Sequence, residues 1–245
     1  MDSVSARWSE RRLGRAPVKT QRNKSAARDR VGSAPGLAPG LTQPTRNSRV
    51  LRRENEIVDA AARVFAERGY HGTSTQAIAD VLGMRQASLY YYFRSKEAAL
   101  ELVCLRGTDG FVEAAEAVVA GGGQPLEKLA RLIAAHLAPI GSRRDYVKVF
   151  INERRYLPDA SRRRLGRKTR RIERCFEHAI LAGIADGSIK SDTDARLAML
   201  AVLGMCNAVI NWRESDRSRD MRDIATGFAE IVANGLAFPE SAPKR

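Results

Sequence analysis

One stretch of the chain, residues 73–96 (TSTQAIADVLGMRQASLYYYFRSK), constrains the fold more than any other. It opens with three hydroxyl residues that can cap a helix, and its apolar residues then recur at helical spacing. Gly83 supplies a tight turn that ends this first helix. A second helix is predicted from roughly Gln86 to Phe93, with Leu89 and Phe93 as apolar anchors one turn apart. Two short helices joined by a turn with glycine are the helix-turn-helix pattern.

The outer face of the second helix favours DNA binding over an ordinary helical hairpin in a bundle. Three consecutive tyrosines are too many to bury together on one narrow helix, and Tyr, Ser, Gln and Arg donors contact phosphates and base edges. Ser95 can cap the next helix, with Lys96 in its first turn, which is a ready site for a phosphate. The candidate DNA-contacting residues are Thr73, Thr75, Arg85, Gln86, Ser88, Tyr90, Tyr91, Tyr92 and Lys96.

The segment from about Arg52 to Leu102 resembles the DNA-binding domain of the TetR family of one-component transcriptional repressors. The words that carry the resemblance are EIVDAAARVFAERGYHGTS, TQAIADVLGM and ASLYYYFRSKEAAL. Arg85 departs from the family, which often has a small capping residue there. The resemblance implies an all-α fold of about nine helices, with a three-helix DNA-binding domain followed by a helical domain for ligand binding and dimerisation. The expected boundaries are a basic tail at 1–48, the DNA-binding domain at 49–97, the second domain at 98–237 and a C-terminal tail at 238–245.

The charge balance also indicates a polyanionic partner. The 245 residues carry a formal net charge of +14, with a pI of about 10.3, which favours nucleic acid over a membrane surface. No uninterrupted run of 18 apolar residues and no signal-peptide pattern are visible, so we expect no membrane span. Three scattered cysteines without metal or redox spacing favour a reduced, cytoplasmic protein associated with the nucleoid.

An enzyme with an attached DNA-binding domain is the least supported class. The second domain shows no Ser-His-Asp order and no metal-ligand cluster, and GGG at 121–123 lacks the Lys-Ser/Thr of a phosphate-binding loop. We therefore expect no catalysis, no metal and no cofactor.

The N-terminal 48 residues leave two interpretations open. Residues 1–49 hold eleven Lys or Arg and three Asp or Glu, around a Gly/Pro-rich centre, which is typical of disorder. The segment is either an inert extension, or codons upstream of the true start, or it is an arm that touches phosphates or the minor groove. If the arm dominated, the protein would be a sequence-independent architectural DNA binder, which is the alternative to a regulator.

Helical spacing continues to the end of the chain. We expect helices from Leu51 to Arg68, from Ser95 to about Ala120, and over 126–137, with a break at Pro139–Ser142. Further helices are predicted around 146–157, from Asp159 to about Ala185, from Asp192 to about Arg213 and from about Arg219 to Leu236, the last two capped by Asp192 and Ser218. The basic run SRRRLGRKTRR is either a solvated face or a patch that faces phosphate.

The last two of these helices predict a homodimer. DARLAMLAVLGMCNAVINW is apolar on nearly every face, and such a helix must be buried on all sides. A domain of this size achieves that only with a partner, so both helices are expected to form a four-helix bundle with their copies. TetR-like repressors dimerise in this way, and two recognition helices one DNA turn apart read a roughly palindromic operator.

A small-molecule site is expected among the helices of the second domain, although its residues would suit an ordinary core equally well. In particular, His136 is either a satisfied core histidine or a polar group in a ligand cavity. The phrases FINERRYLP, LGMCNAVINW and IATGFAEIVANGL resemble a subgroup of lipid- and steroid-catabolism repressors that respond to acyl-CoA thioesters, with a partly different wording around Asn207. The candidate pocket residues are Phe111, His136, Phe150, Glu153, Tyr156, Asn207 and Trp212.

Overall fold

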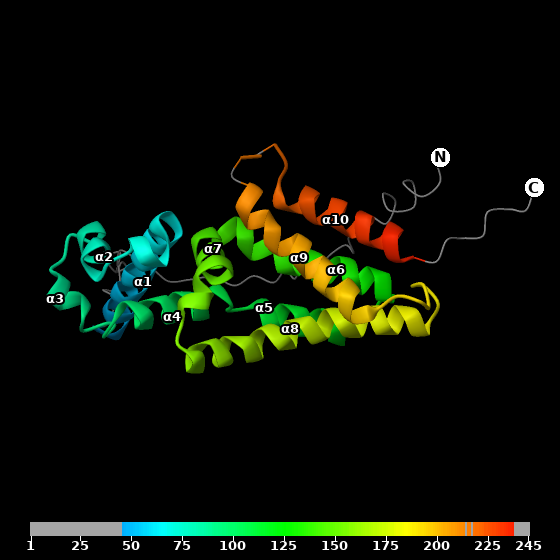
Figure 1. Cartoon of the computed structure of the whole chain (residues 1–245), viewed down its shortest axis with the longest axis horizontal. Helices are drawn as coiled ribbons and strands as arrows, with labels where there is room; N and C mark the ends of the chain where they lie inside the picture. The colour runs from blue at the N-terminus through cyan, green and yellow to red at the C-terminus, as the bar shows by residue number, and fades with distance from the viewer. Residues whose placement is uncertain (1–45, 214, 217, 238–245) are drawn as a thin grey trace, which may run out of the picture. The chain divides into compact units, whose positions relative to one another are not determined.

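The computed structural model describes residues 46–213, 215–216 and 218–237, and its regular structure is helical (Figure 1). The helices are α1 (Arg46–Gly72), α2 (Thr75–Val81), α3 (Gln86–Leu89), α4 (Lys96–Gly107), α5 (Phe111–Ala120), α6 (Pro125–Ser142), α7 (Arg144–Glu153), the short 3₁₀ helix η2 (Arg154–Tyr156), α8 (Asp159–Ala185), α9 (Ala195–Trp212) and α10 (Met221–Leu236). The all-α prediction is confirmed. The predicted tails lie outside the described residues, except that residues 46–48 belong to α1.

Glycine divides the helix that was expected to run from Ser95 to about Ala120. α4 ends at Gly107, and Gly110 then adopts a left-handed backbone conformation with φ of 81° before α5 begins. A residue with a side chain avoids this conformation, so glycine permits the break. The predicted single helix is therefore two helices.

Other predicted ends also move by a few residues. Pro139 lies inside α6, which continues to Ser142, so the predicted break at this proline is wrong. Proline removes one backbone donor without ending the helix here, and the buried Ile140 holds the last turn against the core. The caps of the last two helices are Asp194 and Asp220, whose side chains accept from backbone N–H groups, in place of the predicted Asp192 and Ser218.

Two apolar cores hold these helices together. The first combines α1–α4 with single residues from α7, from the segment before α8 and from α8. Its members include Phe65, Ile78, Leu89, Leu100, Val149, Leu157 and Leu165. The second is formed by α5–α10 and includes Leu132, Ile133, Leu137, Phe176, Ile180, Met199, Cys206 and Ile224. α7 contributes Val149 to the first core and Val147 to the second. The boundary between 97 and 98 stays a prediction, because the first core extends beyond it.

α9 is the helix, within the described residues, that meets the length and composition required to cross a membrane. Its 18 residues have a mean hydropathy of 1.4, and 33% of them are buried. The core helix of a folded domain satisfies the same criterion, and α9 places Met199, Leu203 and Cys206 in the second core. Burial of its exposed apolar residues therefore does not require a membrane.

Candidate DNA-binding surface and its connection to the C-terminal helices

The two short helices α2 and α3 are held by a cap, a turn and three buried anchors. The Ser74 hydroxyl accepts the N–H of Ala77 at 3.1 Å, which satisfies a free donor at the start of α2. Gly83 turns the chain with a φ of 61°. Ile78, Leu89 and Phe93 are buried in the first core, so the opposite face of α3 is directed away from the protein.

The outer face of α3 and its following turn carry exposed hydrogen-bond donors. Tyr91 is 87% exposed and Tyr90 47%, and Arg85 and Ser88 are also exposed. α3 ends at Leu89, four residues before the predicted end, because the N–H of Tyr92 donates to the Leu89 carbonyl in a tighter i→i+3 turn. Tyr90 and Tyr91 therefore lie in the turn that follows the helix.

The remaining predicted DNA contacts have partners inside the protein. Thr73 is buried, and its hydroxyl donates to the Gly69 carbonyl at 2.7 Å. Lys96 Nζ donates to the carbonyls of Tyr70 and Thr73, both at 3.0 Å, and lies 4.1 Å from the centre of the Tyr70 ring. These two side chains lock the end of α1 onto the start of α4, and their DNA contacts stay a prediction.

Two further predicted contacts support the turn itself. The Gln86 amide donates to the Thr75 hydroxyl at 2.6 Å, which ties α3 to α2. Tyr92 is half-buried and meets the Tyr91 ring edge-on at 5.4 Å. The structure therefore brings Arg85, Ser88, Tyr90 and Tyr91 together as the outward set.

Three of the predicted pocket residues meet in the second core. His136 Nε2 lies 3.1 Å from Asn207 Oδ1, and the His136 ring contacts Phe111 and Phe176 edge-on at 5.4 and 6.0 Å between ring centres. Burial lowers the pKa of His136, opposed by its hydrogen bond to Asn207. The His136 Nδ1 atom is buried without a hydrogen-bond partner. A neutral ring that donates through Nε2 therefore presents an unused acceptor. Phe176, which was not among the candidate pocket residues, completes this group.

The other predicted pocket residues lie elsewhere. The Glu153 carboxylate accepts the N–H of Tyr70 at 2.9 Å, and the Tyr156 ring stacks on the Tyr70 ring at 5.1 Å. Phe150 packs against the first core beneath the Arg154 guanidinium. Trp212 contacts Phe228 of α10, with 6.5 Å between ring centres. Three of the four therefore hold the end of α1 or its core rather than sharing one cavity with His136.

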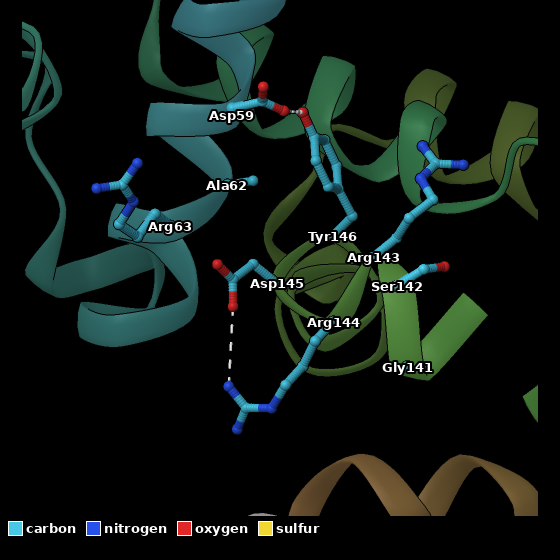
Figure 2. Close-up of a pocket in the computed structure, with 9 residues that line it drawn as sticks. All are labelled: Asp59, Ala62, Arg63, Gly141, Ser142, Arg143, Arg144, Asp145 and Tyr146. Carbon is cyan, nitrogen blue, oxygen red and sulfur yellow. Dashed lines mark hydrogen bonds and ion pairs between the residues drawn. The ribbon is translucent and has the colours of Figure 1, made fainter. Parts of the chain in front are cut away.

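α7 is attached to α1 at two points, and a polar pocket lies beside one of them. At the start of α7, the Tyr146 hydroxyl points at Asp59 and donates to its carboxylate at 2.5 Å, as Figure 2 shows. Burial, with the Asp59 carboxylate, raises the pKa of Tyr146. At the other end, Glu153 binds the backbone of Tyr70. Two bonds two helical turns apart fix the direction of α7 on α1, whereas one bond would leave a pivot.

The pocket in Figure 2 has a volume of about 330 Å³ and lies where α6 meets α7, against α1. Arg143 donates to the carbonyl of Arg106 in the last turn of α4 and, at 3.2 Å, to that of Asp109 in the turn between α4 and α5. Arg144 and Asp145 form an ion pair at 3.8 Å. Charges of both signs line this pocket and are used in contacts among α1, α4 and α7, so its geometry favours a junction between helices over a hydrophobic ligand site.

Comparison with known families agrees with this arrangement. Residues 57–103 match the family described as bacterial regulatory proteins, tetR family, and residues 122–236 match a tetracyclin repressor-like C-terminal domain. The chain belongs to the TetR family. The first match covers the helix-turn-helix with parts of α1 and α4, and the second covers α6–α10. TetR-family proteins are DNA-binding transcriptional regulators, and the expectation that the chain is not an enzyme is confirmed.

Several TetR-family relatives match this chain over nearly their whole length. The HTH-type transcriptional repressor KstR2 of Rhodococcus jostii is 28% identical over 77% of this chain and 93% of its own. The fatty acid metabolism regulator protein of Bacillus subtilis is 26% identical over 74% and 94%. The structure of AibR in complex with isovaleryl coenzyme A and operator DNA is 26% identical, with a TM-score of 0.67 over 73% and 97%. The predicted likeness to repressors of lipid and steroid metabolism is therefore confirmed.

Proposed function

We propose that this TetR-family protein is a transcriptional repressor that binds a roughly palindromic operator as a homodimer and releases it when a small hydrophobic effector, an acyl-CoA thioester, binds. The observation that carries the proposal is the exposed set of donors at α3, mounted on a buried scaffold. Arg85, Ser88, Tyr90 and Tyr91 are free to reach bases and phosphates while Leu89 and Phe93 anchor the helix.

Apolar side chains on α9 and α10 support the homodimer. On α9, Leu197 is 64% exposed and Leu200 48%, and on α10 Ile231 is 62% exposed. A Cβ added at Gly204 or Gly227 would meet no atom within 4 Å. Small residues beside exposed apolar ones allow a second helix pair to approach closely and cover the patch. A dimer also places two recognition helices at the spacing of one DNA turn.

The effector is proposed to bind near His136 in the second core. Its unused Nδ1 acceptor and the aromatic rings of Phe111 and Phe176 provide one polar contact within apolar surroundings. The acyl-CoA class is supported by the relatives, of which AibR was solved with isovaleryl coenzyme A. This proposal involves no metal or cofactor.

The signal is proposed to reach the DNA through α7 together with α4. The proposed DNA-binding domain is 49–97 and the proposed effector and dimerisation domain 98–237. α7 packs on α1 and α4 on one side and on α6 and α9 on the other. An effector that favours a different position of α7 would move Asp59 and Tyr70 with it, because both are bonded to α7. The effector can shift this equilibrium only by its difference in affinity for the two states. The repressor is expected to act in the cytoplasm, associated with the nucleoid.

The first test is a mobility shift with the full chain on DNA from upstream of its own gene, titrated with a panel of acyl-CoA thioesters. We expect a discrete shift that one thioester abolishes. Tyr91→Ala should weaken the binding free energy for the operator by about 1–3 kcal/mol if this ring contacts a base. A discrete shift that the whole panel leaves unchanged would retain the regulator and discard the acyl-CoA effector. A shift equally strong on unrelated DNA would favour the architectural alternative.

The second test addresses the dimer. Leu200→Glu with Ile231→Glu should convert the protein to a monomer in sedimentation equilibrium and reduce operator affinity, because it places charge in the proposed interface. Leu181→Glu on α8 is the matched control, since Leu181 is 52% exposed but lies outside α9 and α10. If the double variant stays dimeric, the proposed interface is refuted.

A further inference from the structure

The basic residues of α8 fall on two stripes that differ in their partners. On the first stripe each cation lies opposite one acid of α4, the α4–α5 turn or α5. The pairs are Arg164 with Glu101, Lys168 with Asp109 at 3.4 Å, and Arg171 with Glu116 through two hydrogen bonds of 2.9 and 2.8 Å. These cations are spaced i, i+4 and i+7, so they form one seam along the helix. This seam has a structural role, because its charges are neutralised within the protein.

The second stripe lies about a quarter turn around the helix, given 3.6 residues per turn. It consists of Arg167, Arg170 and Arg174, and the chain adds Arg196 from the first turn of α9. Together with Arg171 these arginines line a pocket of about 510 Å³, which also contains two glutamates. The pocket therefore carries an excess of positive charge.

Three of the pocket arginines, Arg170, Arg174 and Arg196, form no hydrogen bond or ion pair in the part of the chain that the structure describes, although Glu173 and Glu177 line the same pocket. The Glu116 carboxylate already accepts hydrogen bonds from Arg171, which lower its pKa, and the charge of Arg174 helps to lower that pKa further. Arg170 and Arg174 are like charges at i, i+4, an arrangement that disfavours a helix. An anion from outside the chain would neutralise them.

We propose that this pocket binds the diphosphate of an organic nucleotide, and that the nucleotide end of the coenzyme A effector is its source. This inference rests on the proposed function. Guanidinium groups bind phosphate oxygens through paired hydrogen bonds, and residues four apart on a helix are separated by about 6 Å along its axis. Arg170 and Arg174 therefore present two guanidinium groups to two linked phosphates.

The pocket and the proposed effector site lie on two faces of the same turns of α8. Arg170 and Arg174 point outward, while Ile172 and Phe176 between and beside them are buried in the second core. The Phe176 ring contacts the His136 ring there. A ligand whose anionic end binds the arginine pocket and whose apolar end binds near His136 would thus contact both faces of α8.

The test is calorimetric titration of the full chain, at fixed ionic strength, with coenzyme A, ADP and inorganic pyrophosphate. The variant is Arg170→Gln with Arg174→Gln. The matched control is Arg163→Gln with Arg222→Gln, which removes the same charge from exposed positions of α8 and α10 outside the pocket. We expect coenzyme A to bind roughly tenfold to hundredfold more weakly to the variant, and equally well to the control and the wild type. Operator affinity and its salt dependence should be the same in all three proteins.

Each outcome decides between the sources. Pyrophosphate that binds as tightly as coenzyme A supports the site and makes the ligand a diphosphate in general. No binding of any probe to the wild type, or equal binding to variant and control, overturns the inference. A variant that loses operator affinity and salt dependence instead would show that the arginines contact DNA, and this also overturns it. The proposed function fails separately, when no acyl-CoA releases the operator although coenzyme A still binds through Arg170 and Arg174.

Discussion

Gly107 packs closely against α7, and replacing it with alanine tests that packing. A Cβ at this position would lie 2.7 Å from the Tyr146 carbonyl oxygen and 3.2 Å from Phe150 Cβ. The first distance is about 0.8 Å short of the ~3.5 Å at which nonbonded heavy atoms attract one another. The obstacle is backbone rather than the tip of a flexible side chain, so α4 and α7 must separate.

Overpacking of this kind destabilises a protein by about 1–3 kcal/mol, and the gain from replacing glycine in a helix returns about 0.5–1 kcal/mol. We therefore expect Gly107→Ala to lower the free energy of unfolding by about 1–2 kcal/mol. For a chain of this size this corresponds to a fall in Tm of about 2–8 °C. The measurement is thermal unfolding by circular dichroism at one fixed protein concentration, because the proposed dimer would make Tm depend on concentration.

Gly166→Ala is the matched control. Gly166 lies within α8, and a Cβ there would meet no atom within 4 Å. The free energy of unfolding of this control should rise by about 0.5–1 kcal/mol, since only helix propensity changes. If Gly107→Ala were as stable as Gly166→Ala, the close approach of α4 and α7 described here would be refuted.

Three more predictions concern single side chains. Because burial lowers the folded-state pKa of His136, the unfolded chain binds its proton first as pH falls below about 6.5, so stability should decrease from there until the lower folded-state pKa is reached. His136→Gln should flatten the fall in Tm between pH 7 and 5, and His178→Gln, at an exposed position, should leave it unchanged; an unaltered slope in His136→Gln would contradict this. Lys96→Gln should lower stability by about 1–3 kcal/mol and leave the slope of operator affinity against salt intact, whereas Arg85→Gln should reduce that slope by about 1; the reverse pattern would make Lys96 the phosphate contact. Burial raises the pKa of Cys104 and Cys206 to about 12, so neither thiol should react with iodoacetamide at pH 8 until the protein unfolds, and rapid labelling of the folded protein would show that they are accessible.

The helices were predictable from the sequence because their signals are local. Apolar spacing, together with the capping hydroxyl of Ser74 for α2, places α2 and α8 within a residue or two of their observed positions, since both signals act within one or two turns. The ends at Gly107–Gly110 and Pro139 were harder to predict. Glycine only permits a break and proline only weakens a helix, and the buried neighbours decide which happens.

The candidate sites were less predictable because they depend on distant contacts. Glu153 and Tyr156 have the composition of a pocket, yet they bind Tyr70, which lies more than eighty residues earlier in the chain. Lys96 occupies the sequence position of a phosphate contact, yet its ammonium group donates to the carbonyls of Tyr70 and Thr73, more than twenty residues earlier in the chain. No signal in the local sequence distinguishes these roles. The exposure of Tyr91, by contrast, was predictable, because three adjacent tyrosines cannot all be buried on one narrow helix.

The first core includes Val149, Leu157 and Leu165, which come from segments far beyond the proposed DNA-binding residues in the sequence. A fragment cut after residue 97 would leave Ile57, Phe65 and Leu89 without part of their cover, so we expect it to be poorly folded. The proposed DNA-binding domain, residues 49–97, is therefore not expected to fold when it is fused to another protein at residue 97. A chimera should carry α1–α4 together with α7 and the start of α8, and by the same reasoning the two parts of the chain should lose their structure in one cooperative step.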